Sequence, residues 1–431
     1  MILRLSTPAA RALLVFVAVV FAVALSYSGI RNSLAVQFAG QNTLESYERA
    51  TRFEPDDARN WYLLGRYWQY NLEDPDAQRA IRTYQTSLSL DPHSADTWLD
   101  LATAYESEDD LAAARNAFLQ AKRSYPLSPE VSWRYGNFLL RRGETDAAFA
   151  QFRIAVQSDP KRGAAAFAIS MRLDPDIHAV LDRVFPHSQD AYLSVINALS
   201  EQGQTDQALV VWAALANLHP RMRLLESYPF LNALTGKRQM LAAKQVWDQA
   251  LEFAGLSRPA DPSGSLVWDG GFESDVPVGG LNWYYPAFVG GVQIGLDTGE
   301  KHSGKRSLRL TFNGLNNVNF NDVCQYIAVQ PSTSYHFSAW LQTRSLSTDQ
   351  GVRFGLHSMS DTVNSMAWTD DLQGTQPWTH IELPWTSGND VQELVLCVSR
   401  NASRKFDSKI RGSAWIDDVA LVPAPPEPAK P

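Results

Sequence analysis

The feature that most constrains this fold is a pattern that returns after 34 residues in the middle of the chain. The pattern is an alanine, a phenylalanine, a second alanine and a proline, found at positions 114, 118, 121 and 126 and again at 148, 152, 155 and 160. Phe118 and Pro126 also correspond to Tyr84 and Pro92 at the same displacement. Matching chemistry in one register predicts a structural unit that recurs along the chain. A unit of this size cannot bury its apolar face alone, so the units are expected to stack.

The residues inside one unit predict two helices that pack closely. Trp98, Leu101 and Tyr105 recur at three- and four-residue steps, which puts them on one face of a helix. Small alanines allow the second helix to approach the first, and the proline ends that second helix. With its period of 34 residues the pattern resembles the tetratricopeptide repeat. The resemblance implies an all-α solenoid over residues 44–255, which begins with a half unit and contains a shortened or distorted pair at 161–186.

The geometry of the same family implies a groove lined by the first helix of each unit. The candidate groove residues are arginines, aromatic residues and amides: Arg59, Tyr62, Arg66, Gln69, Tyr70, Trp133, Asn137 and Arg141. Arginine together with aromatic side chains is typical of protein-binding surfaces, so we expect a protein partner in this groove. The alternative is that these side chains form ordinary solvated helix faces.

An apolar run near the N-terminus sets the expected compartment. Residues 12–25 are all apolar, and the uncharged stretch continues as far as Arg31, which is about the length that crosses a bilayer core. Arg4 and Arg11 precede the run and only Arg31 follows it closely. This asymmetry predicts that the N-terminus stays in the cytoplasm and the rest of the chain lies outside.

Two interpretations of this run remain open. We predict a short cytoplasmic segment at 1–11 and a single-pass transmembrane signal anchor at 12–30, in the inner (cytoplasmic) membrane. The bulk of the chain would then be periplasmic or extracellular. The alternative is a cleaved signal peptide, with weak cleavage sites at Ala22-x-Ala24 or Ser33-x-Ala35.

Beyond residue 255 the hydrophobic period changes from that of a helix to that of a strand. Residues 256–265 are rich in proline, glycine and serine and are expected to form a linker. Apolar residues then alternate with a period of two in several short runs, at 307–312, 335–341, 352–356 and 394–398. Short strands separated by turns predict an all-β sandwich or barrel. The proline-rich tail at 424–431 is expected to be disordered.

Short phrases make the β prediction more specific. They include Asp-Gly-Gly-Phe-Glu at 269–273, His-Ser-Gly-Lys-Arg-Ser-Leu at 302–308 and Trp-Ile-Asp-Asp-Val at 415–419. In that order they resemble the jelly-roll carbohydrate-binding modules of groups 4, 9 and 22. The resemblance implies a jelly-roll sandwich over 266–423. The expected fold class is therefore multidomain, with an N-terminal transmembrane helix, an all-α solenoid and an all-β sandwich.

The resemblance also implies one structural calcium ion where the first and last strands of the sandwich meet. The matching ligands are Glu273 and Asp417, completed by backbone carbonyl groups near Ser303. Calcium takes hard oxygen ligands, and two carboxylates with carbonyl groups would suffice. The alternative is that both carboxylates are exposed or paired with nearby lysine and arginine residues.

The chain has two cysteines, Cys324 and Cys397, which excludes disulfide-dense and zinc-cluster scaffolds. Both lie on predicted strands of the sandwich. Outside the cytoplasm they can form a disulfide, and the alternative is a pair of buried free thiols.

Aromatic side chains are the candidates for sugar binding, because the C–H face of a pyranose stacks on an aromatic ring. The alternation over 335–341 places Tyr335 and Phe337 in the core and Trp340 on the other face of the strand. We expect Trp340 to form a glycan cleft together with the side chains that lie beside it or in loops: Arg353, His357, Tyr284, Tyr285 and Trp368. The alternative is that the tryptophans belong to the core.

Composition narrows the class of function. The chain has 431 residues, of which 45% are hydrophobic, and this predicts two or three globular domains. A formal net charge of -8 argues against nucleic-acid binding through phosphate neutralisation. No nucleophile elbow, His-Glu-x-x-His motif, P-loop or dinucleotide fingerprint occurs in the sequence, so we predict that the protein is not an enzyme.

Together these features predict a non-enzymatic, membrane-anchored scaffold outside the cytoplasm. Its repeats would bind a protein partner, and its sandwich would bind or brace against cell-envelope polysaccharide, in polysaccharide assembly or export. One alternative is a pure protein-interaction adaptor with a structural sandwich. The other is a glycan hydrolase of unrecognised type, since two carboxylates suffice for that chemistry.

Overall fold

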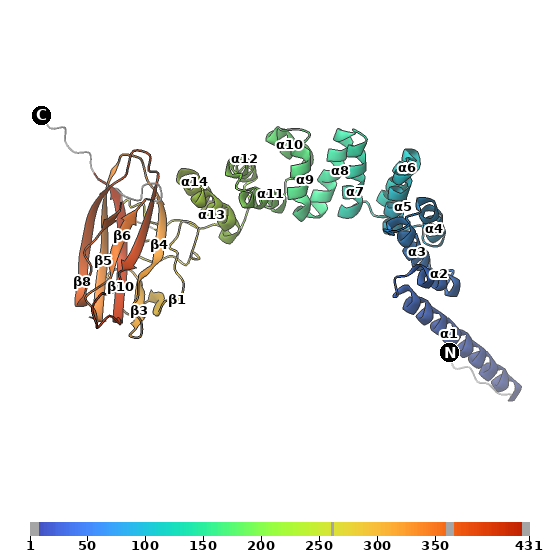
Figure 1. Ribbon diagram of the computed structural model, residues 1–431, viewed down its shortest axis with the longest axis horizontal. Helices are drawn as coiled ribbons and strands as arrows, with labels where there is room; N and C mark the ends of the chain where they lie inside the picture. Colours follow the sequence, from blue (N-terminus) through green and yellow to red (C-terminus); the bar gives the residue numbers. More distant parts are fainter. Residues whose placement is uncertain (1–7, 260–262, 359–365, 425–431) are drawn as a thin grey trace. The chain divides into compact units, whose positions relative to one another are not determined.

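The structure is a computed structural model that describes residues 8–259, 263–358 and 366–424. It forms two compact units, Met1–Pro186 and His187–Pro431 (Figure 1). The first seven residues of the expected cytoplasmic segment, the middle of the expected linker and the tail from residue 425 lie outside the described residues.

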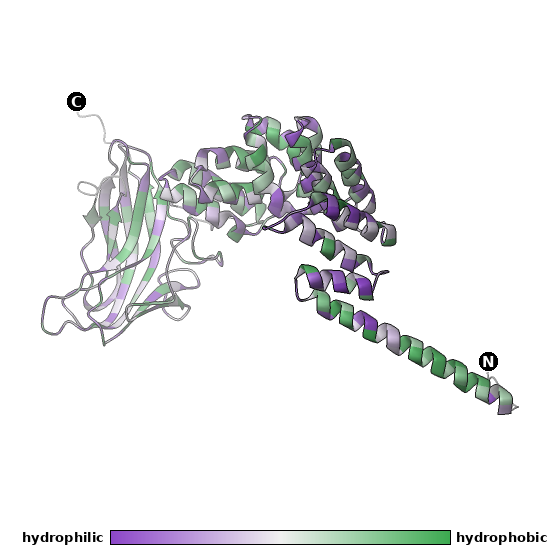
Figure 2. Ribbon diagram, turned by 45° about the vertical axis from the view of Figure 1, so that its right-hand side comes forward, coloured by the Kyte–Doolittle hydropathy of each residue, from purple (hydrophilic) through white to green (hydrophobic). Residues whose placement is uncertain are grey.

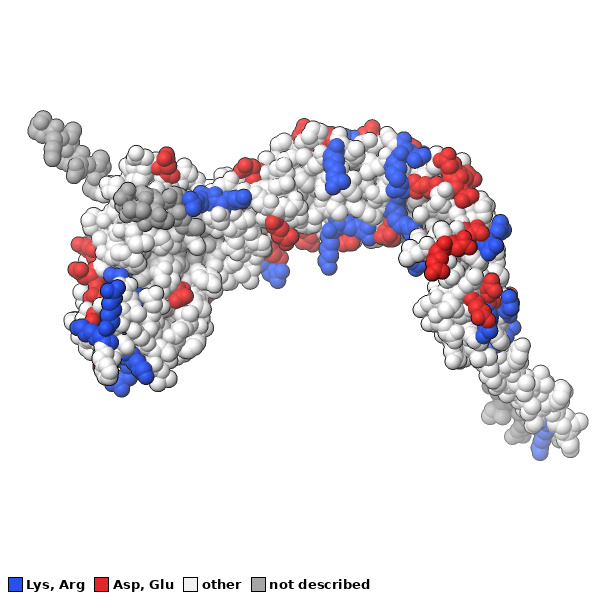
Figure 3. Space-filling view, in the orientation of Figure 1, with Lys and Arg blue, Asp and Glu red and all other residues white. Residues whose placement is uncertain are grey.

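The first unit begins with a long apolar helix, α1 (Pro8–Ala39). Its stretch from Arg11 to Ala39 is long and apolar enough to cross a membrane, and none of its most apolar window is buried. Figure 2 shows α1 as mostly hydrophobic, and Figure 3 shows very few charged side chains on the visible face of it. The predicted apolar helix is therefore present, and it continues past the predicted end at residue 30 without a break.

Paired helices follow α1 in the order that the repeat predicts. Their bounds are α2 (Leu44–Phe53), α3 (Ala58–Tyr70), α4 (Ala77–Leu90), α5 (Ala95–Ser107), α6 (Leu111–Ser124), α7 (Pro129–Arg141) and α8 (Thr145–Ser158). Six of these helices begin at a Thr, Asp or Ser whose side chain accepts a hydrogen bond from a backbone N–H of the first turn. Such caps explain why these six helices start where they do.

Two glycines show why the repeat requires small residues between its helices. A Cβ atom on Gly65 would lie 2.6 Å from the ring of Tyr84, and one on Gly136 would lie 2.8 Å from the ring of Phe152. In both of these pairs the second helix therefore places an aromatic ring directly against the backbone of the first. Ala114, Phe118 and Ala121, which defined the repeat, are all buried.

The irregular stretch after α8 forms a shortened pair, as predicted. It contains the short 3₁₀ helix η1 (Pro160–Arg162), then α9 (Gly163–Met171) and α10 (Ile177–Val184). The prolines at 175 and 186 flank α10 and limit its length.

The second unit begins with helices and continues into the sandwich. Its helices are α11 (Gln189–Glu201), α12 (Thr205–Ala216), η2 (Leu224–Ser227), α13 (Tyr228–Gly236) and α14 (Met240–Phe253). Trp212 and Trp247 are each 2% exposed and form the packed centre of these pairs. Trp247 also contacts Trp268 edge to face at 5.5 Å, so α14 packs against the start of the β domain.

The β domain consists of two antiparallel sheets. The six-stranded sheet has the order β1-β2-β3-β10-β5-β8 and the four-stranded sheet has the order β4-β9-β6-β7. The strands are β1 (Phe288–Val289), β2 (Val292–Asp297), β3 (Ser307–Asn313), β4 (Phe320–Ala328), β5 (Ser334–Leu346), β6 (Arg353–His357), β7 (Ala367–Trp368), β8 (Gly374–Thr386), β9 (Glu393–Arg400) and β10 (Arg411–Pro423).

Alternate residues of both sheets meet in one hydrophobic core. Phe337 and Leu341 on β5 are 0% exposed, as are Phe354 and Leu356 on β6 of the other sheet. Each sheet therefore has one inner face and one outer face, and the all-β sandwich is confirmed. Cys324 and Cys397 form a disulfide between β4 and β9, with their Cα atoms 4.2 Å apart, so of the two alternatives the structure has the disulfide and not the free thiols.

Candidate functional site

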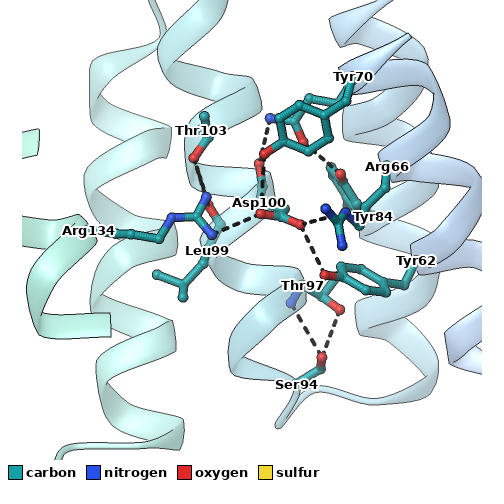
Figure 4. A network of polar contacts seen from close by, with 11 residues as sticks. Tyr62, Arg66, Tyr70, Tyr84, Ser94, Thr97, Leu99, Asp100, Thr103 and Arg134 are labelled. Atoms are coloured by element: carbon teal, nitrogen blue, oxygen red, sulfur yellow. Dashed lines mark hydrogen bonds and ion pairs between the residues drawn. The ribbon is translucent and has the colours of Figure 1, made fainter. Parts of the chain in front are cut away.

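Three of the predicted groove residues gather around one carboxylate, that of Asp100 on α5 (Figure 4). Tyr62 donates a hydrogen bond to Asp100 Oδ2 at 3.1 Å and Tyr70 donates one to Oδ1 at 3.4 Å. Arg66 Nε lies 3.7 Å from Oδ2. Asp100 itself is only 5% exposed, so these donors replace the water that its charge would otherwise bind.

Further contacts lock the same cluster, which we call the Asp100 network. Arg134 on α7 donates from Nη1 to Asp100 Oδ1 at 2.9 Å. Gln69 donates to the backbone oxygen of Asp100 at 3.3 Å and accepts from the hydroxyl of Tyr84 at 2.6 Å. Burial raises the pKa of Tyr62 to about 12 and also raises the pKa of Tyr70 and Tyr84. All three hydroxyls are therefore protonated donors at neutral pH.

The charged members of the Asp100 network occupy one position of the repeat. Arg66, Asp100 and Arg134 differ in residue number by 34 and lie on α3, α5 and α7, the first helices of three successive pairs. Residues at equivalent repeat positions stack along a solenoid. Asp100 and Arg134 are not among the groove residues predicted from the sequence, although their displacement from Arg66 by whole repeats is a signal that identifies them.

The other predicted groove residues lie outside this network. Arg141 forms a bidentate pair with Glu106, with both distances at 2.7 Å. Asn137 donates to the backbone oxygen of Trp133 on its own helix at 2.8 Å, and the Trp133 ring packs against Phe152 at 5.1 Å. Arg59 is exposed in the first turn of α3.

Four of the six predicted glycan residues share the outer face of the four-stranded sheet. Directly opposed residues form a row across that sheet, running Trp368, Gly355, Cys397 and Cys324. Tyr284 forms a β-bridge with Cys324 and extends this row. Arg353 and His357 lie two residues before and after Gly355 on β6, on the same face because side chains alternate along a strand. We call this surface the Trp368 face.

The Trp368 face presents two aromatic rings, those of Trp368 and Tyr284, and includes a glycine, Gly355. A Cβ atom on Gly355 would lie 2.3 Å from the Trp368 ring, so the ring can rest on β6 only because this residue is glycine. The guanidinium carbon of Arg353 lies 4.4 Å from the centre of the same ring. Trp368 is 36% exposed and Tyr284 is 59% exposed. Burial lowers the pKa of His357, which favours its neutral form.

The prediction that Trp340 forms a cleft with Arg353 and His357 is wrong. Trp340 lies on β5 in the six-stranded sheet, and its ring stacks on His302 with centres 3.8 Å apart. The outer faces of two packed sheets point in opposite directions, so residues on β5 and β6 cannot share one outer surface. Tyr285 is also absent from the Trp368 face, because it packs against the core.

The two predicted calcium ligands are both held by backbone N–H groups. Asp417 is 0% exposed, and its Oδ2 accepts from the N–H groups of His302 at 2.8 Å and Ser303 at 3.1 Å. Glu273 Oε1 accepts from the N–H groups of Lys305 and Arg306. Within the described part of the chain neither carboxylate forms an ion pair with lysine or arginine. Burial raises the pKa of Asp417 to about 6.

The two carboxylates approach the same point in space. A Cβ atom on Gly271 would lie 3.6 Å from Glu273 Cγ and 3.8 Å from Asp417 Oδ1. Glu273 also lines a hollow of about 580 Å³ together with Asp269 and Ser303. The described residues contain no group of three metal-ligating side chains, so an ion here would depend on backbone carbonyl ligands. With that condition the donor set fits calcium, which takes hard oxygen ligands.

Comparison with known proteins identifies the repeats. The tetratricopeptide repeat family matches residues 71–129 and 99–163. No curated protein matches the chain. Among solved structures, the tetratricopeptide repeat protein YrrB, described as having an unusual peptide-binding site, has 17% sequence identity and a TM-score of 0.26, covering 49% of this chain and 94% of its own.

Two solved carbohydrate-binding modules are similar to the β domain. One is a family 16 carbohydrate-binding module, with 20% identity and a TM-score of 0.25, covering 36% of this chain and 99% of its own. The other is the CBM22-1 xylan-binding domain of Paenibacillus barcinonensis Xyn10C, with 16% identity and a TM-score of 0.26, covering 38% of this chain and 97% of its own. The chain therefore combines tetratricopeptide repeats, matched within residues 71–163, with a β-sandwich domain.

Proposed function

We propose that this protein is a non-enzymatic scaffold that α1 holds in a membrane, that binds a protein partner through its repeats and that binds polysaccharide through its sandwich. The observation that best supports polysaccharide binding is the arrangement of side chains on the Trp368 face. Two exposed aromatic rings, a guanidinium and an imidazole lie on one surface there, above a disulfide that joins two of its strands. Aromatic rings suit the C–H faces of sugar rings, and the polar groups suit hydroxyls.

The repeats support a protein partner through the composition of the Asp100 network. Tyr70 is 47% exposed, and the side chain of Arg66 is 52% exposed while it stacks on both Tyr62 and Tyr70. Their orientation is held by Asp100, so little side-chain entropy would be lost when a partner binds. Aromatic and arginine side chains of this kind dominate the energetics of protein interfaces.

The anchor interpretation is supported by how α1 ends. Arg31 forms a bidentate pair with Glu54 at 2.9 and 2.8 Å, and Phe38 stacks on Phe53 with ring centres 5.4 Å apart. Ala35 is 0% exposed. The weak cleavage site Ser33-x-Ala35 therefore lies inside a packed helix, which favours retention of α1 over removal as a signal peptide.

The localisation is tested with tags at both ends of the full chain. We expect the two tags to stay on one polypeptide that remains in the membrane after alkaline extraction, with the C-terminal tag degraded by protease added to the periplasmic side. A shortened protein in the soluble periplasmic fraction would reject the anchor.

A structural calcium ion is part of the same proposal. Glu273 and Asp417 would hold it with backbone carbonyl groups near Ser303. The ion would neutralise the buried carboxylate of Asp417 and tie the turn at 302–306 to the last strand, β10.

Glycan binding is tested with the full chain in detergent micelles, by affinity electrophoresis against a panel of polysaccharides. We expect retardation by at least one polymer, and we expect Trp368→Ala together with Tyr284→Ala to abolish it. Trp340→Ala is the matched control, because that tryptophan lies on the opposite outer face. Loss of binding in the control alone would reject the Trp368 face, and no retardation by any polymer would leave the protein-interaction adaptor.

A further inference from the structure

Many arginine side chains in the described part of this protein lie against aromatic rings. Almost all of these arginines also pair with a carboxylate or a backbone oxygen. Over the described ranges, ten arginines lie against an aromatic ring. Eight of these also pair with a carboxylate: Arg49, Arg66, Arg79, Arg115, Arg162, Arg183, Arg309 and Arg344. A ninth, Arg258, donates to the backbone oxygens of Ser265 and Val267.

Arg353 is the exception. It stacks on Trp368, but among the described residues it has neither an ion-pair partner nor a hydrogen-bond acceptor, and its Nε atom is buried without a partner. Two residues beyond Gly355, His357 Nδ1 is also buried without a hydrogen bond. A buried donor without a partner costs free energy, and the described residues supply no acceptor for Arg353 Nε.

The outer face of the six-stranded sheet shows what the same chain does when a stack is purely structural. Arg309 and Arg344 lie 5.2 and 4.9 Å from the ring of Trp415, which is 2% exposed. Arg309 pairs with Asp297 at 3.5 Å and Arg344 pairs with Glu300 at 2.5 Å. Both charges are thus neutralised from within, and the tryptophan between them is covered. At Arg353 the described residues supply no carboxylate, and the tryptophan is exposed.

We propose that the missing partner comes from the ligand, and that Arg353 binds the carboxylate of a uronic acid in an acidic polysaccharide. This inference rests on the proposed glycan-binding role of the Trp368 face. A guanidinium binds a carboxylate through two parallel hydrogen bonds, with both charge and geometry matched. A uronic acid carries that carboxylate on a pyranose ring, whose C–H face suits Trp368 or Tyr284. One sugar residue can therefore satisfy the arginine and cover an exposed ring together.

The test compares polymers that differ only in charge. Polygalacturonate, alginate and hyaluronate are each presented beside their carboxyl-reduced forms to the full chain in detergent micelles, and affinity is measured by electrophoresis. We expect at least tenfold tighter binding to one acidic polymer than to its reduced form. Arg353→Gln should remove this preference and leave the weaker binding to the reduced form unchanged. Arg309→Gln is the matched control, because that stacked arginine has its own carboxylate, and it should keep the preference.

The outcomes separate this inference from the function on which it rests. Equal binding to an acidic polymer and its reduced form would overturn the uronic acid assignment while leaving glycan binding in place. A preference lost equally in both variants would indicate a general charge effect and would also overturn it. Absence of binding to every acidic polymer would overturn the uronic acid assignment, and absence of binding to the whole polysaccharide panel as well would overturn the glycan-binding proposal itself.

Discussion

The repeats and the sandwich are stabilised by contacts of very different range along the chain. In the repeats the polar contacts join residues one unit apart, such as Asp100 with Arg134 and Glu106 with Arg141. In the sandwich they join distant residues: Cys324 and Cys397 are separated by 73 positions, and Leu421 donates its N–H to Ser265, 156 positions away. A solenoid gains stability unit by unit, whereas a sandwich requires its distant strands to assemble together.

Breaking the disulfide is the largest expected change and should affect the sandwich alone. A cross-link that closes a loop of 73 residues is worth about 4 kcal/mol in the chain-entropy account. We therefore expect the double variant Cys324→Ala, Cys397→Ala to lower the melting temperature of the sandwich strongly. Hydrogen exchange measured by mass spectrometry should show faster exchange in β4 and β9 and unchanged exchange in α3–α8. Equal loss of protection in the repeats would contradict the separation of the two regions.

Removing the carboxylate of Asp100 is the corresponding change in the repeats. Asp100→Ala leaves two arginines and two tyrosine hydroxyls without their common acceptor, and loss of one member of a buried ionic group costs about 3 kcal/mol. We expect faster hydrogen exchange in α3, α5 and α7 and no change in the sandwich strands. Glu108→Ala, at an exposed carboxylate that receives a hydrogen bond from Gln78, is the control and should change little. Protection in α7 that survives Asp100→Ala would show that the network does not couple the pairs.

The pH dependence of the sandwich sharpens the comparison further. Burial raises the pKa of Asp417 from 3.8 to about 6, so the folded state holds this proton more tightly than the unfolded state does. Its contribution to stability is therefore present at low pH and is lost as the pH rises from about 4 to 6, then stays constant. Asp417→Asn should flatten this part of the profile of melting temperature against pH.

Calcium should act on the same carboxylate with the opposite sign. A bound ion requires deprotonated Asp417, so we expect calcium to raise the melting temperature of the sandwich more at pH 7 than at pH 4.5. Identical melting temperatures with calcium and with chelator at pH 7 would reject the ion. The repeats, which lack this carboxylate, should show no response.

The smallest expected effect comes from the exposed pair of Arg141 and Glu106. The side chain of Arg141 is 51% exposed, so solvent screens the pair and Arg141→Ala should cost only about 0.5 kcal/mol. We expect this change to fall further at high salt, measured as the shift in denaturation midpoint of the repeats. If Arg141→Ala destabilised the repeats as much as Asp100→Ala does, burial would not be what determines the relative strength of the two ion pairs.

The repeats were predictable in more detail than the sandwich, and particular residues show why. The displacement of Phe118 to Phe152 identifies one packing position twice, and both rings are buried in the structure. The same displacement from Arg66 leads to Asp100 and Arg134. The repeat spacing can therefore identify the charged residues of the candidate groove. Contacts between neighbouring units follow from sequence spacing because each unit packs on the next.

For the candidate site on the sandwich, the sequence predicted which kinds of side chain face outward but not which of them lie together. Alternation along β5 and β6 correctly separates the core residues from the outward Trp340, Arg353 and His357. Alternation alone could not show that Trp340 belongs to one sheet and Arg353 to the other. The residues that were expected to form one cleft therefore lie on two different outer faces.

By itself the sequence determined the apolar N-terminal helix, the recurring helix pairs and the change to strands after residue 255, because each depends on the periodicity of neighbouring residues. Tertiary structure alone decided which strands share a sheet, that Cys324 and Cys397 face each other, and that Arg353 has no carboxylate partner among residues 8–259, 263–358 and 366–424. These features depend on contacts across many tens of residues. The pairing of distant strands is set by the packing of the whole core, and no local spacing records it.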